Sequence, residues 1–210
     1  MSDDFSRKVQ TLISQIDQIG QDRKAILEAL ANKIADQLQE HGFSKIIFVC
    51  THNSRRSQLA QIWFWQAIRI FDLAAISSYS GGTEVAAFNH RMVEALRRFG
   101  FEIVAQDKSS NPRYALCAPD AKDKGLVLFS KTYSDDFNPQ KDFIAVMVCG
   151  QADEGCPFVP GAYGRVSLPY DDPKAADDTK HESITYDAKV AEIGREMLYL
   201  AKALKQIKQG

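Results

Sequence analysis

Near residue 50, a short apolar run is followed by a polar loop and then by an apolar-rich helix. The run KIIFVC at residues 45–50 is rich in β-branched side chains and is typical of a buried strand. The loop is THNSRRS, and the helix covers residues 58–71. A strand without polar alternation is buried on both faces, which favours a parallel sheet covered by helices. The unit therefore predicts an α/β domain.

Strands and helices alternate along the rest of the chain. This alternation predicts a doubly wound, four-stranded parallel sheet. Ligands bind such sheets outside the carboxyl ends of the strands, so Cys50 and Cys149, which both end an expected strand, should lie near each other. The other expected elements are strands at 74–80, 143–149 and 165–170, helices at 89–99 and 183–207, and two strands at 113–118 and 125–133 around a polar turn.

Residues 4–40 carry apolar side chains at helical spacing. Gly20 is expected to split this region into a hairpin of two helices, and Gly42 is a plausible end of the second. Two roles remain open for this N-terminal extension, residues 1–42. We favour packing on the main domain, residues 43–210, and keep open a homodimer formed through these helices.

Charge and hydropathy exclude several classes of partner. The 210 residues include 26 basic and 27 acidic side chains, a formal charge of −1, so no general attraction to nucleic acid is expected. The first ten residues are polar and acidic, unlike a signal peptide, and no apolar run approaches the roughly 18 residues that cross a bilayer. We therefore expect a cytoplasmic protein without nucleic-acid or membrane partners, in which any attraction for an anion is local.

The loop after residue 50 is suited to bind such an anion. Backbone N–H groups at the start of a helix favour a tetrahedral oxyanion, and Arg56 can clamp two of its oxygens. The same field stabilises the thiolate of Cys50 and makes it a nucleophile. The alternative is an inert buried thiol before an ordinary turn; the complete strand, C-x5-R-S and helix context favours the functional interpretation. The predicted oxyanion-binding residues are Thr51, His52, Asn53, Ser54, Arg55, Arg56 and Ser57.

The four cysteines do not form a metal-binding pattern. There is no C-x2-C pair, and the four histidines show no ligand spacing, so we expect neither a metal nor another cofactor. Cys117 is interpreted as structural. Cys149 and Cys156 follow an expected strand and precede Pro157.

The loop CTHNSRRS resembles that of the low-molecular-weight protein tyrosine phosphatases and the related thioredoxin-coupled arsenate reductases, C-x-G-N-x-C-R-S. The likeness continues through SQLAQIW at 57–63 and SYSGGTE at 78–84 and covers roughly residues 44–205, with an apparent insertion near 105–140. It implies a flavodoxin-like sheet, with Cys50 as nucleophile and Asp172, directly before Pro173, as general acid. In isolation, an Asp-Pro pair is more often a surface turn. Two departures stand out: His52 replaces a glycine, and Arg55 replaces a cysteine.

The resemblance also implies a role for the C-x6-C-P spacing. If this chain works as those reductases do, Cys149 would attack the arseno-sulfur intermediate on Cys50. Cys156 would then attack the resulting Cys50–Cys149 disulfide. A thioredoxin-like reductant would then reduce the Cys149–Cys156 disulfide.

Three functions remain in competition. We favour reduction of arsenate to arsenite. The alternative is hydrolysis of phosphomonoesters through a phosphocysteine on Cys50, although Lys174 stands where a phosphotyrosine specialist has an aromatic side chain. The third is a non-enzymatic anion-sensing or redox-interaction module, if His52 and Arg55 prevent turnover.

Overall fold

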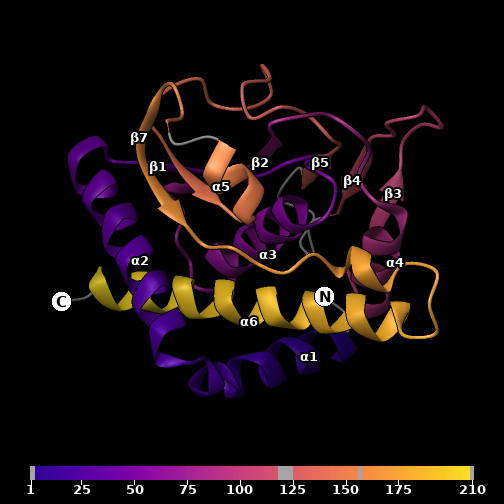
Figure 1. Cartoon of the computed structure of the whole chain (residues 1–210). Coiled ribbons are helices and arrows are strands. Elements are labelled where there is room, and N and C mark those ends of the chain that lie inside the picture. Colours follow the sequence, from indigo (N-terminus) through magenta and orange to yellow (C-terminus); the bar gives the residue numbers. More distant parts are fainter. Residues whose placement is uncertain (1–2, 118–124, 156–157, 209–210) are drawn as a thin grey trace.

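The computed structural model describes residues 3–117, 125–155 and 158–208. Its centre is a four-stranded parallel sheet in the order β2-β1-β6-β7, flanked by helices, as the alternation of elements predicts (Figure 1). The two middle strands, β1 and β6, are almost entirely buried because both of their faces are covered. The strands are β1 Ser44–Cys50, β2 Ile76–Gly82, β6 Phe143–Met147 and β7 Ala162–Ser167.

The C-terminal helix α6, Glu182–Ile207, packs against α1, α2, α3 and α4 (Figure 1). Its approach to α3 is close at Gly194, where a Cβ atom would lie 2.5 Å from Trp63 Cε2. Trp63 is fully buried there, which agrees with the expectation that aromatic side chains after the loop belong to the core. The helices of this layer are α3 Arg56–Ile70 and α4 His90–Phe99.

The N-terminal residues form a helix pair that shares its core with the sheet. Gly20 separates the two helices with an extended backbone, and Gly42 ends the second at φ 74°, as expected. The apolar side chains of the pair are buried against the rest of the molecule, chiefly through α6. Dimerisation through these helices stays a prediction. The elements are α1 Asp3–Ser14, the 3₁₀ turn η1 Ile16–Gln18 and α2 Gln21–His41.

Some boundaries differ from those expected. Strand β7, Ala162–Ser167, begins and ends three residues earlier than predicted, where its residues pair with β6. Strand β2 is two residues later, in register with β1 up to the pair Cys50–Gly82. The strand expected at 143–149 ends at Met147, and the short helix α5, Gly150–Gly155, which follows it, was not expected.

A second, antiparallel sheet lies within the segment around residues 103–128. It has the order β3-β4-β5. The strands β4, Tyr114–Leu116, and β5, Leu126–Leu128, are the expected pair, and β3, Ile103–Ala105, was not expected. Among the described residues, no helix has the length and apolar character required to cross a membrane.

Candidate functional site

The site lies at the carboxyl ends of β1 and β6, where a doubly wound sheet binds its ligands. Cys50 is the last residue of β1 and Cys149 follows β6 by two residues. Both thiols are buried, and the Thr51 hydroxyl lies 3.5 Å from Cys149 Sγ. The two cysteines therefore border the same loop, as their places at strand ends predicted.

The Cys50 sulfur is held at the start of α3. Ser57 Oγ lies 3.0 Å from Cys50 Sγ and accepts a hydrogen bond of 2.8 Å from the Asn53 side-chain amide. Because the Asn53 amide supplies one hydrogen to this oxygen, the hydroxyl's own hydrogen is available for the sulfur. Ser57 therefore links the Cys50 sulfur to the Asn53 side chain.

Asn53 is the brace of the loop. It is fully buried and has φ 46°, a left-handed conformation that asparagine tolerates. Its Oδ1 accepts hydrogen bonds from the Lys131 backbone N–H at 3.0 Å and from Gln58 Nε2 at 3.2 Å. Every polar atom of this side chain therefore has a partner, and these uncharged hydrogen bonds hold the loop at its centre.

The loop is backed by residues 129–132 and by Gly82. Ser130 Oγ donates to the His52 carbonyl at 2.8 Å. A Cβ atom on Gly82 would lie 2.6 Å from the Thr51 carbonyl oxygen and 2.8 Å from Asn53 N, so only glycine fits there. These supports are not evident in the local sequence, since they come from segments about 30 and 80 residues away.

His52 and Arg55 turn their side chains away from the loop's interior. His52 is half exposed, with Nε2 3.3 Å from Glu84 Oε2. Its φ is not positive, so the backbone accepts a Cβ where relatives of the loop have glycine.

Arg55 instead joins the loop to α6. Its Nε donates to Tyr186 OH at 2.9 Å, and its Nη2 lies 3.3 Å from Asp177 Oδ2. Tyr186 OH in turn donates to Asp177 Oδ1 at 2.7 Å. Burial and this hydrogen bond raise the pKa of Tyr186 to about 12, so the phenol stays protonated.

Arg56 contacts the residue expected to be the acid. Its Nη2 lies 2.7 Å from Asp172 Oδ2, and its Nη1 donates to the Tyr170 carbonyl at 3.0 Å. The other Asp172 oxygen accepts the Lys174 backbone N–H at 3.0 Å and lies 3.9 Å from Arg55 Nε. The structure thus brings Asp172 to the loop, although Asp172 lies 116 residues from Arg56 in the sequence.

The structure describes residues 149–155 of the segment that carries Cys149 and Cys156. Cys149 Sγ accepts a hydrogen bond from Ala152 N at 3.4 Å, inside α5. Cys156 and Pro157 lie outside the described residues, so the predicted Cys149–Cys156 pairing stays a prediction.

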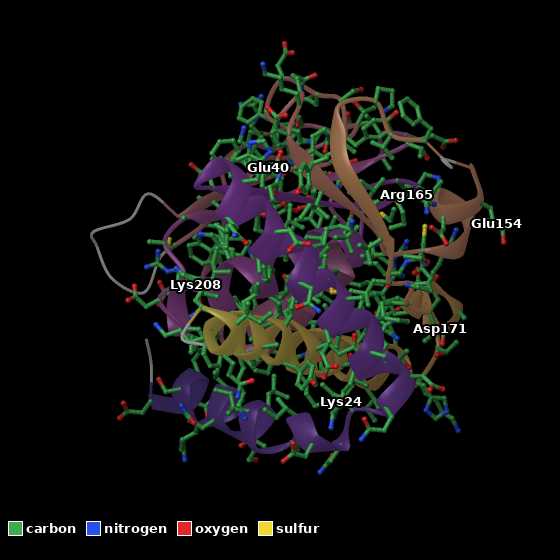
Figure 2. All side chains as sticks on the ribbon, turned by 90° about the vertical axis from the view of Figure 1, so that its left-hand side faces the viewer. Lys24, Glu40, Glu154, Arg165, Asp171 and Lys208 are labelled. Atoms are coloured by element: carbon green, nitrogen blue, oxygen red, sulfur yellow. The ribbon has the colours of Figure 1, made fainter. Side chains whose placement is uncertain are left out.

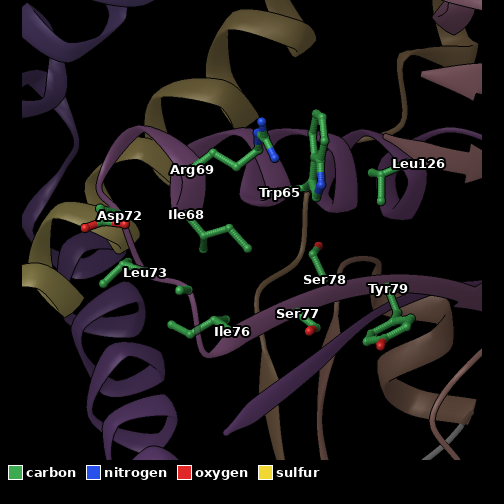
Figure 3. A pocket seen from close by; sticks show the side chains of 11 residues that line it. Trp65, Ile68, Arg69, Asp72, Leu73, Ile76, Ser77, Ser78, Tyr79 and Leu126 are labelled. Carbon is green, nitrogen blue, oxygen red and sulfur yellow. The ribbon is translucent and has the colours of Figure 1, made fainter. Parts of the chain in front are cut away.

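A cavity of about 1010 Å³ opens beside these groups. It is bounded by Arg56 and Asp172, by Gln151 and Glu154 of α5, and by Arg23 of the N-terminal helix pair, among others. Figure 2 shows Glu154 and Asp171 on the same side of the molecule. A second cavity, about 590 Å³, lies between α3 and β2 near Trp65 and Tyr79 and contains none of the predicted site residues (Figure 3).

The amino-acid sequence is similar to those of known arsenate reductases. The chain is 30% identical to an arsenate reductase of Halalkalibacterium halodurans over 162 residues, which are 76% of this chain and 96% of that protein. It belongs to the arsenate reductase family. Another member, from Bacillus subtilis, is 28% identical over 76% of this chain and 96% of its own length. No family model matches the chain.

Solved structures confirm the fold of this arsenate reductase family member. A low-molecular-weight phosphotyrosine phosphatase from Vibrio cholerae superposes with a TM-score of 0.51 at 15% identity, covering 80% of this chain and 99% of that one. A low-molecular-weight protein tyrosine phosphatase from Bacillus subtilis gives 0.50 at 19% identity over 78% and 99%. The low-molecular-weight phosphatase fold inferred from the Cys50 loop is therefore correct.

Proposed function

We propose that this protein reduces arsenate to arsenite through a relay of three thiols, Cys50, Cys149 and Cys156. The observation that carries the proposal is the position of Cys149, buried beside the oxyanion loop with its sulfur 3.5 Å from the Thr51 hydroxyl. Hydrolysis of a phosphoester requires one cysteine, whereas reduction requires two electrons from a thiol pair. Membership of the arsenate reductase family supports the same choice.

In the first step, arsenate binds to the loop's backbone N–H groups and Arg56. The Cys50 thiolate, stabilised by Ser57, attacks arsenic, forming an S–As bond as one arsenate oxygen leaves. Asp172 supplies the proton that lets this oxygen depart as water. Arg56 already contacts Asp172 at 2.7 Å, so substrate must share or replace this contact.

In the second step, the Cys149 thiolate attacks Cys50 Sγ. A Cys50–Cys149 disulfide forms, the S–As bond breaks, and its electron pair stays on arsenic, which leaves as arsenite. The Cys156 thiolate then attacks Cys149 Sγ and releases Cys50 as a thiolate. A thioredoxin-like dithiol returns the Cys149–Cys156 disulfide to two thiols, which requires a reducing compartment such as the cytoplasm.

The alternative is a phosphatase that uses Cys50, Arg56 and Asp172 alone. The observation in its favour is that the Arg56–Asp172 pair and the Cys50–Ser57 contact both form without Cys149. Attack on a phosphomonoester would give a phosphocysteine on Cys50, and water would then release phosphate. A non-enzymatic anion sensor is a weaker third proposal, because the Ser57 hydroxyl 3.0 Å from Cys50 Sγ supports a nucleophilic role for this thiol.

The test measures arsenate and an aryl phosphate in parallel. Arsenate-dependent NADPH oxidation, coupled through thioredoxin and its reductase, is expected for wild type and lost in Cys149→Ser. Cys117→Ser is the matched control, since that thiol is exposed and borders no predicted site residue. Full arsenate turnover by Cys149→Ser would contradict the proposed thiol relay. Rapid p-nitrophenyl phosphate hydrolysis without arsenate reduction would establish the phosphatase instead.

A further inference from the structure

Arg23, in the first turn of α2, reaches from the N-terminal helix pair to the segment that carries the predicted acid. Its Nε lies 3.0 and 2.9 Å from the two carboxylate oxygens of Glu196 in α6. Its Nη1 donates to the Pro169 carbonyl at 3.0 Å. Its guanidinium lies over the ring of Tyr170, 4.4 Å from the centroid. Arg23 therefore has three separate contacts around this segment.

Tyr170 links the Arg23 contacts to Arg56 of the candidate site. Its hydroxyl donates to Glu196 at 2.6 Å, and its carbonyl accepts the bond from Arg56. Burial, and then the Glu196 charge, raise the pKa of Tyr170 well above its usual value, so the phenol remains a donor. Asp172 follows two residues later. A shift of Pro169 or Tyr170 would therefore move both the guanidinium of Arg56 and the carboxyl of Asp172.

Glu196 depends on Arg23 for charge compensation. Glu196 is 6% exposed, and Arg23 is its ion-pair partner. Removing the guanidinium would leave a buried carboxylate with only a phenol donor, which is unfavourable. The Arg23–Glu196–Tyr170 cluster would then rearrange, and the acid segment would move with it.

We propose that Arg23 is a positioning residue for the oxyanion site, which makes the N-terminal helix pair part of the catalytic machinery. Arg23 acts by fixing Pro169 and Tyr170, and through them Arg56 and Asp172. Arg23 and Arg56 also border the same 1010 Å³ cavity, so the pair forms a wall of the opening to the site. The proposal rests on the Cys50 loop being an oxyanion site, as proposed above.

The test compares Arg23→Met and Arg23→Lys with a matched control, Arg98→Met. Methionine keeps an apolar stem near Tyr170, and lysine keeps the charge but cannot hold Glu196 and Pro169 together. Arg98 forms the same type of ion pair with α6, at Asp187, but borders no predicted site residue. If Arg23→Met does not fold, Arg23→Lys carries the test.

The first readout is protection of Cys50 from iodoacetamide by inorganic phosphate, followed by peptide mass spectrometry. The second is kcat and KM for arsenate, and the third is Tm. We expect Arg23→Met to weaken phosphate protection and to lower kcat/KM by about 10-fold each, because a misplacement of about 1 Å is costly at an oriented site. Arg23→Lys should keep part of the phosphate protection and of kcat/KM. Arg98→Met should leave both quantities at their wild-type values.

Two outcomes would overturn the proposal. In the first, Arg23→Met lowers Tm but leaves phosphate protection and kcat/KM at the wild-type values, which is the behaviour of a residue that only stabilises the fold. In the second, phosphate does not protect wild-type Cys50 at all. Failure of arsenate reduction alone is a different result: it removes the proposed function, while a change in phosphate protection on Arg23→Met still supports the positioning role.

Discussion

The oxyanion loop and the acid segment meet at Arg56 but are held in place by different forces. The loop from Cys50 to Arg55 is braced by buried, neutral hydrogen bonds around Asn53 and by the close fit of Gly82. The segment 169–177 is held by the charged side chains of Arg23, Arg55 and Arg56. Neutral buried bonds make a fixed cradle, whereas ion pairs can exchange with a charged substrate. Under the proposed mechanism, this difference suits a loop that binds an anion and an acid whose contact with Arg56 the anion replaces.

The largest effect is expected from Arg56→Lys, because Arg56 belongs to both regions. Lysine cannot contact an oxyanion in a bidentate manner and also hold the Tyr170 carbonyl and Asp172. We expect kcat/KM for arsenate to fall by roughly 100-fold or more, with the fold retained. Steady-state kinetics with circular dichroism checks this, and a fall below 10-fold would contradict a shared role.

Gly82→Ala tests the fixed cradle. The added Cβ would lie 2.5–2.8 Å from backbone atoms of Glu84, Thr51 and Asn53, none of which can move freely. We expect a loss of about 1–3 kcal/mol in the free energy of unfolding and at least a 10-fold loss of kcat/KM. Gly20→Ala is the control, because its Cβ would meet nothing within 4 Å. Equal behaviour of the two variants would show that the loop is not rigid.

Tyr186→Phe tests the ion-paired segment 169–177. The change removes the hydroxyl that joins Arg55 to Asp177, so the acid segment should loosen while the loop keeps its braces. We expect kcat/KM to fall by about 3- to 10-fold, with phosphate protection of Cys50 little changed. The opposite pattern, intact turnover with lost phosphate protection, would place Tyr186 in the loop's support instead.

The same variant has a predicted alkaline signature. The folded-state pKa of Tyr186 is raised to about 12 from a usual value of 10, so its stabilising contribution is complete below pH 10. That contribution is lost as the pH rises through 12. Denaturant titrations should therefore show wild type losing stability between pH 10 and 12 faster than Tyr186→Phe.

The smallest catalytic effect is expected from Lys131→Met. Lys131 braces Asn53 through its backbone N–H, which the substitution keeps, while burial lowers the pKa of its ammonium to about 8. Below pH 8 the charged amine is buried at a cost, which is relieved as the pH rises from 8 towards 10.5. Methionine should therefore stabilise the protein at pH 7 and give less gain near pH 10, with kcat/KM within about 3-fold of wild type.

Much of this arrangement could be predicted from local sequence. The run KIIFVC, the loop THNSRRS and the helix after it define a strand–loop–helix unit whose geometry follows from neighbouring residues. The order of strands and helices predicted a parallel sheet, and strand-end positions predicted that Cys50 and Cys149 meet at one edge. The bounds of β7 were wrong and α5 was not predicted, because strand pairing, which joins distant segments, sets the ends of β7 and β6.

The sequence alone determined the strand–loop–helix unit at Cys50, the parallel sheet and the placement of Cys50 and Cys149 at the same edge, because each depends on short-range patterns or on strand direction. Only the tertiary structure decided that Arg55 contacts Tyr186 of α6, that Gly82 and Lys131 back the loop, and that Arg23 of the N-terminal helices contacts the Pro169 carbonyl. The physical reason is that these contacts join residues about 30 to 170 positions apart, and their partners are chosen by how the helices pack around α6.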